Sequence, residues 1–245
     1  MAKNEAFRRG GGSHQADAAL PTRPGQREDD SASTVAVVDD DSAVREAVGD
    51  LLRSIGLQVE DFGSAKDLLA QLCPERTNCL VMDIRLPQRS GLELYEDLGR
   101  AKINLPVVFI SGYADVSIAV RAMKAGAVDF LTKPFGEQEL LDAVQTAIRR
   151  DQVRRERARV VAVLRQRYSA LTAREQQLMR FVISGRRNKE IASEMAVTEV
   201  TVKAHRNQVM RKMGARSVSA LIGMAQLLGL EEARPEALIP VGQIS

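Results

Sequence analysis

The stretch CLVMDIRLP at residues 79–87 places four apolar side chains directly before a carboxylate, Asp83. An unbroken apolar run of this length is typical of a strand that is buried on both faces of a parallel sheet. The stretch therefore predicts a central strand at Cys79–Met82 with Asp83 at its carboxyl end.

Four more short apolar runs surround this strand in the sequence, and a segment with helical spacing follows every run. The predicted strands are Val35–Val38, Leu57–Phe62, Cys79–Met82, Val107–Ile110 and Val128–Leu131. The predicted helices are Ala43–Ile55, Ala65–Leu72, Gly91–Arg100, Val116–Ala125 and Glu137–Arg149. Five strand-then-helix units predict an α/β domain whose parallel sheet is covered on both faces through right-handed crossovers.

Polar side chains follow the predicted strands at one edge of this sheet. Asp39-Asp40-Asp41 follows the first strand, Asp83 the third, Ser111 the fourth and Lys133-Pro134 the fifth. In open α/β sheets the functional site lies at the carboxyl ends of the strands, where the strand order switches. We therefore expect these residues to form one site. For Asp41 alone we prefer the interpretation that it caps the following helix.

Together these segments resemble a response-regulator receiver domain over about residues 34–150. The matching motifs are VVDDD at 37–41, VMDIRLP at 81–87, ISG at 110–112 and LTKPF at 131–135. The resemblance implies a flavodoxin-like sheet in the order 2-1-3-4-5 and a phosphoacceptor at Asp83. It implies Mg²⁺ held by Asp39, Asp40, Asp83 and the backbone carbonyl of Arg85. Ser111 and Lys133 would engage the phosphate, and Phe130 would be the switch aromatic, although plain core packing is an alternative for Phe130.

Charge divides the chain into an acidic and a basic part. Residues 34–150 hold 13 Lys and Arg against 18 Asp and Glu, whereas residues 151–245 hold 17 against 9. This asymmetry favours a cation site in the first part and a polyanionic partner for the second. Residues 150–168 read as a basic, amphipathic helical linker that could run on from the preceding helix. We weigh two roles for it equally, a dimerising helix and a solvated one.

From Leu171 onward the spacing is wholly helical. Thr172 with Glu175 predicts a capping box before a helix that Gly185 ends. A short helix from Asn188 to Met195 follows. Thr198 is predicted to cap the next helix, which runs from Glu199 to Met213 and ends at Gly214. Ser217 is predicted to cap the last helix, which runs to Leu228 and ends at Gly229. A tight turn between the second and third helices predicts a helix-turn-helix.

This region resembles a LuxR-type helix-turn-helix domain, and both halves together resemble the NarL/FixJ response regulators. The motifs are LTARE at 171–175, NKEIA at 188–192, TVKAHR at 201–206 and MRKM at 210–213. The resemblance implies that Glu199–Met213 enters the major groove of DNA, with Lys203, Ala204 and Asn207 at base edges. Phosphate contacts are expected from Lys189, Thr201, Arg206, Arg211 and Lys212. We expect Val200, Val202, Val209 and Met213 to be core.

The predicted organisation is a disordered extension at 1–33, a receiver at 34–149, a linker at 150–168, a helix-turn-helix domain at 169–230 and a tail at 231–245. The implied function is a cytoplasmic transcription regulator, expected to activate, that a sensor histidine kinase phosphorylates at Asp83. Phosphorylation would favour a homodimer on promoter half-sites of double-stranded DNA, with RNA polymerase as a candidate partner. No apolar run approaches the ~18 residues of a membrane span. Cys73 and Cys79 are read as two reduced thiols.

Two other interpretations use the same residues. In one, the receiver is only a dimerisation module of a DNA-binding protein, and the intact set of Asp40, Asp83, Ser111 and Lys133 argues against it. In the other, the chain is a Mg²⁺-dependent phosphatase with Asp83 as nucleophile. That activity needs a general acid close to the nucleophile, and Arg85 stands two residues on. We therefore expect no enzyme activity beyond phosphoacceptor chemistry and slow self-dephosphorylation.

Overall fold

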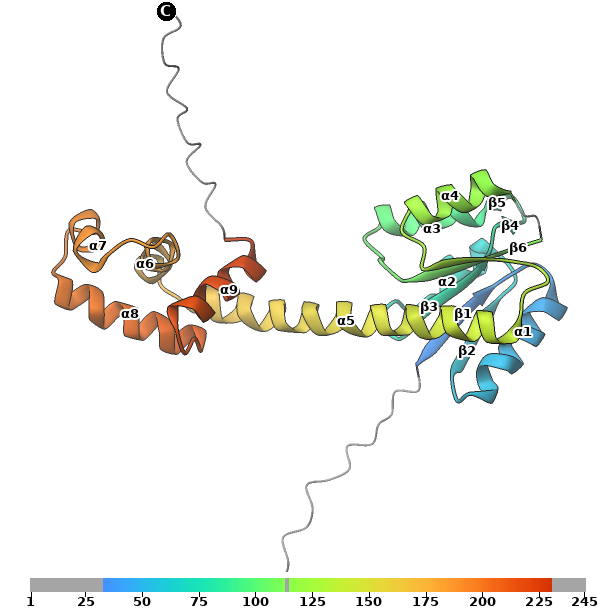
Figure 1. Cartoon of the computed structure of the whole chain (residues 1–245), viewed down its shortest axis with the longest axis horizontal. Coiled ribbons are helices and arrows are strands. Elements are labelled where there is room, and N and C mark those ends of the chain that lie inside the picture. The colour runs from blue at the N-terminus through green and yellow to red at the C-terminus, as the bar shows by residue number, and fades with distance from the viewer. Residues whose placement is uncertain (1–32, 113–114, 231–245) are drawn as a thin grey trace, which may run out of the picture. The chain divides into compact units, whose positions relative to one another are not determined.

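A five-stranded parallel sheet forms the centre of the N-terminal domain (Figure 1). The computed structural model describes residues 33–112 and 115–230. The strands of this sheet are β1 (Thr34–Val38), β2 (Gln58–Phe62), β3 (Thr77–Asp83), β6 (Val107–Ser111) and β7 (Asp129–Thr132). Their order is β2-β1-β3-β6-β7, and every neighbouring pair is parallel. This is the predicted flavodoxin-like order, because β4 and β5 lie outside the main sheet.

Helices cover both faces of the sheet. They are α1 (Ser42–Ser54), α2 (Ala65–Gln71), α3 (Gly91–Arg100), α4 (Val116–Lys124) and α5 (Glu137–Ser169). Along β1 the side chains alternate, so Ala36 and Val38 pack with α2, α3 and α4, whereas Val35 and Val37 pack with α1 and α5. All four are fully buried. Burial on both faces explains why the strand is apolar at every position.

Local sequence signals set where the helices of this domain begin. Asp41 caps α1 by accepting a hydrogen bond from the backbone N–H of Ala43, as predicted. Ser90 and Glu93 form a capping box at the start of α3. Both caps stand directly behind the carboxyl ends of strands. α1 and α3 therefore begin close to the ends of strands.

A second, two-stranded sheet was not predicted. β4 (Arg85–Leu86) pairs antiparallel with β5 (Arg89–Ser90). The hairpin turn between them contains Gln88 with a φ of 71°, in the left-handed region. Strands of two residues are too short to produce a periodic pattern, so the sequence gives no sign of them. The hairpin thereby fixes the position of the residues that directly follow Asp83.

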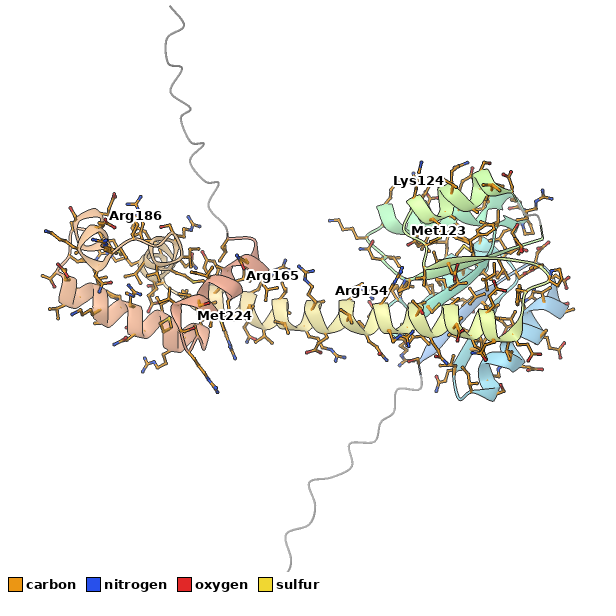
Figure 2. The ribbon with its side chains drawn as sticks, viewed as in Figure 1. Met123, Lys124, Arg154, Arg165, Arg186 and Met224 are labelled. Atoms are coloured by element: carbon orange, nitrogen blue, oxygen red, sulfur yellow. The ribbon has the colours of Figure 1, made fainter. Side chains whose placement is uncertain are left out.

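Helix α5 has 33 residues and runs without a break through the predicted linker. Arg154 and Arg165 both extend from it (Figure 2). The first turns of α5 pack on the sheet through Leu140 and Val144, and the last turns contribute Leu164 to the C-terminal core. Among the described residues, neither α5 nor any other helix is both long and apolar enough to cross a membrane.

A buried carboxylate holds the middle of α5 to the N-terminal end of β3. Asp151 is fully buried and accepts hydrogen bonds from Asn78, Arg154 and Arg155. Asn78 also accepts from the backbone N–H of Thr34, 3.0 Å away. Arg155 further donates to the backbone carbonyls of Pro74 and Glu75, just before β3, and of Thr77, the first residue of β3. We call Asn78, Asp151, Arg154 and Arg155 the linker clamp.

Cys79 lies next to the linker clamp on β3. Burial raises the pKa of its thiol, and the charge of Asp151 raises it further. The thiol therefore stays protonated at neutral pH. Cys73 and Cys79 are both free cysteines, as predicted.

Four helices follow the end of α5 in the part of the chain that the structure describes. They are α6 (Ala173–Ile183), α7 (Asn188–Glu194), α8 (Glu199–Met213) and α9 (Val218–Leu228). Thr172, Thr198 and Ser217 cap α6, α8 and α9 as predicted. Gly214 and Gly229 end α8 and α9 with φ values of 72° and 68°, which a residue with a β-carbon rarely adopts.

The core of the C-terminal domain corrects one prediction. Val202, Val209 and Met213 are buried as expected. Val200 is not core, because 77% of it is exposed. Val200 is two residues before Val202 on the same helix, a separation of about 200° at 100° per residue, so the two side chains point to opposite faces.

The predicted disordered extension at 1–33 lies outside the described residues except for residue 33. The predicted tail at 231–245 lies outside them entirely.

Candidate functional sites

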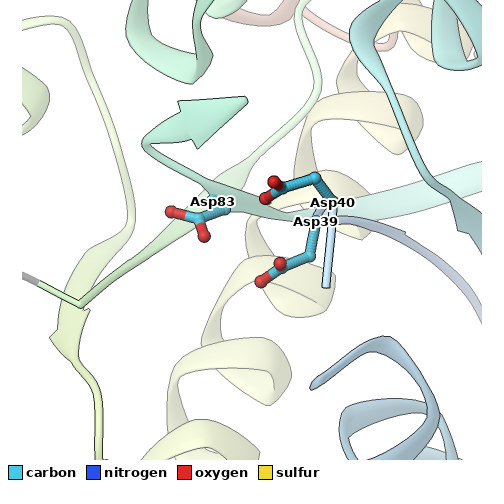
Figure 3. A group of neighbouring side chains, drawn as sticks. All are labelled: Asp39, Asp40 and Asp83. Atoms are coloured by element: carbon cyan, nitrogen blue, oxygen red, sulfur yellow. The ribbon is translucent and has the colours of Figure 1, made fainter. Parts of the chain in front are cut away.

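Three carboxylates meet at the carboxyl ends of β1 and β3 (Figure 3). Asp39 and Asp40 follow β1, and Asp83 is the last residue of β3. One oxygen of every side chain lies within 4.8 Å of an oxygen of the other two. Asp39 and Asp83 are buried, whereas Asp40 is exposed. The group is therefore open to solvent on the side of Asp40.

Lys133 joins this group from the residue after β7. Its Nζ lies 2.6 Å from Asp39 Oδ2 and 2.9 Å from Asp83 Oδ2. Burial alone would lower the pKa of Lys133, but hydrogen bonds to Asp39 and Asp83 and the charges of both carboxylates raise it overall. The ammonium is therefore retained at neutral pH and offsets part of the repulsion between the two carboxylates.

Backbone donors fix the remaining oxygens of the two buried carboxylates. Asp83 Oδ1 accepts from the backbone N–H of Arg85 at 3.0 Å, and Asp39 Oδ1 accepts from that of Asp41 at 2.9 Å. The N–H of Arg85 therefore points towards Asp83. These bonds hold both side chains in one orientation before any ligand binds.

Ser111 lies on β6, the neighbour of β3, and Phe130 lies on β7, the neighbour of β6. Ser111 is the buried last residue of β6, where the ladder aligns Ile110 with Asp83. The backbone carbonyl of Ser111 accepts from Lys133 N at 2.7 Å, which joins the ends of β6 and β7. Phe130 on β7 is partly buried against the core that α2, α3 and α4 share. Ser111 thus belongs to the same sheet edge as Asp83, and Phe130 is at least in part a core residue.

The donor set at this edge fits a hard divalent cation. Three carboxylates supply oxygen ligands, which Mg²⁺ prefers, and the open side near Asp40 leaves space for the waters that Mg²⁺ retains. The residues that could hold it are Asp39, Asp40 and Asp83, with the carbonyl of Arg85 as the further expected ligand.

Sequence reasoning missed Gly91 at this edge. Gly91 is the first residue of α3, and its backbone N–H donates to the carbonyl of Ile84 at 2.9 Å. The glycine was assigned to a helix start, and only the folded chain brings it against Asp83.

A second candidate site is the exposed face of α8. Lys203, Ala204 and Asn207 are all exposed and lie at i, i+1 and i+4 along this helix. Their spacing places them on one side, opposite Val202 and Val209 in the core. Because all three side chains are exposed, an elongated partner can reach this side of α8.

Basic residues lie beside that face, and they differ in their exposure and in their hydrogen-bond partners. Lys189 on α7 and Arg211 on α8 are exposed. Arg206 is partly buried and donates to Asn188 Oδ1 at 2.7 Å. Thr201 shares a hydrogen bond with the capping residue Thr198.

Lys212 is partly buried and is paired with a buried carboxylate. Its Nζ lies 2.6 Å from Oε2 of Glu175, whose side chain is only 5% exposed. The hydrogen bond from Lys212, and further bonds from Thr172, lower the pKa of Glu175. Lys212 therefore neutralises a buried carboxylate that also completes the cap of α6.

Comparison with known proteins gives two family matches. Residues 35–145 match the response regulator receiver domain family, and residues 169–225 match the bacterial regulatory proteins of the luxR family. Together the two matches span most of the described chain.

Several characterised proteins resemble the chain over most of their length. Nodulation protein W of Bradyrhizobium diazoefficiens is 48% identical over 206 residues, which cover 84% of this chain and 91% of that protein. The transcriptional regulatory protein FixJ of Azorhizobium caulinodans is 40% identical over 201 residues, covering 81% and 94%. The solved structure of the response regulator StyR superposes with a TM-score of 0.70 at 45% identity, covering 79% and 98%. The chain therefore belongs to the two-component response regulators of the NarL/FixJ family, in which a receiver domain is joined to a LuxR-type DNA-binding domain.

Proposed function

We propose that a sensor histidine kinase phosphorylates this transcription regulator at Asp83, and that phosphorylation favours a dimer that binds promoter DNA. The observation that carries the proposal is the position of Lys133 between Asp39 and Asp83, at 2.6 and 2.9 Å. A cation between two carboxylates, with a third alongside, is an arrangement suited to an incoming dianionic phosphoryl group.

The chemistry at Asp83 follows from its surroundings. A carboxylate oxygen of Asp83 bonds to the phosphorus of a phosphohistidine, the P–N bond breaks, and the imidazole leaves. Lys133 offsets the charge on the transferred group, and the Ser111 hydroxyl donates to one of its oxygens. Mg²⁺, held by Asp39, Asp40, Asp83 and the carbonyl of Arg85, would neutralise phosphoryl charge during the transfer. Slow hydrolysis of the acyl phosphate returns the chain to its starting state.

A change in the packing near α4 is the proposed response. Movement of Ser111 towards the phosphate would free space that Phe130 can fill, since both lie on adjacent strands. Val116, Val120 and Met123 are exposed apolar side chains on α4. We propose that this face forms the dimer contact after phosphorylation.

DNA recognition is assigned to α8. Lys203, Ala204 and Asn207 read base edges, and Lys189, Thr201, Arg206 and Arg211 contact phosphates. We assign Lys212 to the stability of the domain instead of to phosphate binding, because Glu175 already engages its Nζ.

The proposal also covers the cellular location of the protein and the domains that carry out its function. We place the protein in the cytoplasm as an activator that works with RNA polymerase. The functional parts are the receiver at 34–149, the linker at 150–168 and the DNA-binding domain at 169–230. FixJ is a transcriptional regulatory protein and StyR a response regulator, which favours this proposal over a phosphatase.

Light scattering of the full chain with Mg²⁺, with and without beryllium fluoride, tests the response to a phosphoryl mimic. We expect a shift from monomer to dimer and tighter DNA binding, both lost in Asp83→Asn. Asp50→Asn is the matched control, because Asp50 is an exposed aspartate on α1. A chain that remains monomeric in both conditions contradicts the dimerisation proposal.

A further inference from the structure

Val200 is an apolar side chain exposed at the start of the recognition helix. It is the second residue of α8, and 77% of it is exposed. Valine has a lower helix propensity than most residues, so α8 gains nothing from it locally. A single exposed valine is ordinary on a protein surface. Whether Val200 can contact a partner depends on which side of the helix it occupies.

Val200 lies on the same side as the residues assigned to base edges. Val200, Lys203, Ala204 and Asn207 are spaced i, i+3, i+4 and i+7, the pattern of one helical face. All four are exposed. Residues near the N-terminus of a recognition helix are the ones that approach base edges most closely. Val200 is therefore the leading apolar group of this face.

The chemistry of the side chain narrows what it can contact. An isopropyl group neither donates nor accepts a hydrogen bond, so it cannot recognise phosphates or the polar edges of guanine, adenine or cytosine. Thymine alone presents a methyl group in the major groove. Apolar contact with that methyl removes both groups from water. Ala204 offers one methyl on the same face, whereas Val200 offers two and reaches further.

We propose that Val200 is a specificity-determining residue that contacts a thymine methyl in the operator half-site. The inference rests on the proposed role of α8 in DNA recognition and adds an apolar reader to it. Through this contact the protein would prefer half-sites with thymine at the base pair that faces the first turn of α8.

The test pairs a protein substitution with the removal of one methyl group from DNA. Sites are first selected from random duplexes with the full chain activated by beryllium fluoride. Each thymine of the preferred half-site is then replaced by deoxyuridine, and affinity is measured by fluorescence anisotropy. For the wild type we expect about a fourfold loss at one position, the equivalent of one buried methyl group. Val200→Ala should lose less than twofold on the same replacement.

Val218→Ala is the matched control. Val218 is also a partly exposed valine in the first turn of a helix, α9, after a serine cap. We expect Val218→Ala to show the full deoxyuridine effect. Val200→Ala should fold normally because alanine favours helix and no core contact is lost. A thermal melt of each variant checks this.

The sites that Val200→Ala selects, and its sensitivity to deoxyuridine, decide whether the proposal holds. If Val200→Ala selects the same sites and remains as sensitive to deoxyuridine as the wild type, the proposal is overturned. If Val200→Ala binds every sequence more weakly by the same factor, Val200 packs on the DNA backbone, and the proposal is again overturned. Failure of the wild type to bind any DNA would instead refute the assignment of α8 to DNA recognition.

Discussion

Gly91 lies against the backbone of Asp83 so closely that a β-carbon at residue 91 would come within 2.1 Å of the Asp83 carbonyl oxygen. The first residue of α3 and the residue assigned as phosphoacceptor are therefore in direct backbone contact. Because the atom in the way is backbone, it cannot rotate aside as a flexible side chain could. The size of residue 91 thus controls the position of the segment after β3.

Gly91→Ala is expected to destabilise the receiver and impair phosphorylation of Asp83. Relief of the overlap requires α3 to move away from β3, at a cost of about 1–3 kcal/mol in the free energy of unfolding. Gly99→Ala is the control on the same helix, because a β-carbon there meets nothing within 4 Å. It should stabilise the chain by about 0.5–1 kcal/mol. Urea denaturation of both variants measures the difference, and equal midpoints would refute the steric argument.

Lys133→Gln should separate phosphoryl transfer from cation binding. The amide cannot supply the charge that offsets the transferred group, so labelling by acetyl phosphate should slow by about 100-fold. Affinity for Mg²⁺ should rise, because the ammonium no longer competes for oxygens of Asp39 and Asp83. Lys124→Gln, at the exposed end of α4, should change neither quantity (Figure 2). Weaker Mg²⁺ binding in Lys133→Gln would contradict this account of the site.

The linker clamp lies at the opposite end of β3 from Asp83. We predict that its loss loosens the attachment of α5 to the receiver. Asn78→Ala removes a donor to the buried Asp151 and the acceptor of Thr34 N–H. Each unsatisfied buried group costs about 1–3 kcal/mol. Hydrogen–deuterium exchange should become faster in α5 around residues 148–158 and at the start of β1.

Asn104→Ala serves as the control for the clamp, since Asn104 is exposed. It should leave exchange in α5 unchanged. If Asn78→Ala also left it unchanged, the clamp would have no role in holding α5 to the receiver.

The Glu175–Lys212 pair predicts how the stability of the C-terminal domain depends on pH. The pKa of Glu175 is lowered by the hydrogen bond from Lys212 and by Thr172. A carboxylate with a lowered pKa in the folded state adds stability above its ordinary value of 4.5 and loses it as the pH falls further. Glu175→Gln should therefore cost about 1.5–3 kcal/mol at pH 7 and progressively less below pH 4.5.

Calorimetry of the full chain at pH 7 and at pH 4 measures this dependence. Glu194→Gln is the control, because the Glu194–Arg186 pair is exposed and should contribute less than about 1 kcal/mol. A Glu175→Gln deficit that is the same at both pH values would show that the carboxylate charge is not what stabilises the domain.

The sheet and its polar edge could be predicted because each strand carried its own signal. The runs ending at Val38 and Met82 are buried on both faces, so every position had to be apolar. Asp39, Asp83 and Lys133 stand at the ends of separate strands, and parallel order then brings those ends together. The caps at Asp41, Thr172 and Thr198 were equally readable, because a cap depends on residues within one turn.

What escaped prediction depends on contacts between distant segments. Gly91 was unremarkable until the fold brought it against Asp83. Asp151 sits in a run of arginines typical of a solvated helix, and its burial depends on Asn78, 73 residues earlier. Val200 was assigned to the core together with Val202, but its place on α8 puts it on the opposite face of the helix.

Mapping of the acyl phosphate shows whether Asp83 is the phosphoacceptor. The full chain is incubated with acetyl phosphate and Mg²⁺, treated with borohydride to reduce any acyl phosphate to an alcohol, and analysed by tandem mass spectrometry. We predict that the modified residue is Asp83 and that omission of Mg²⁺ abolishes the product. Modification at another aspartate, or none at all in a folded chain, would contradict it.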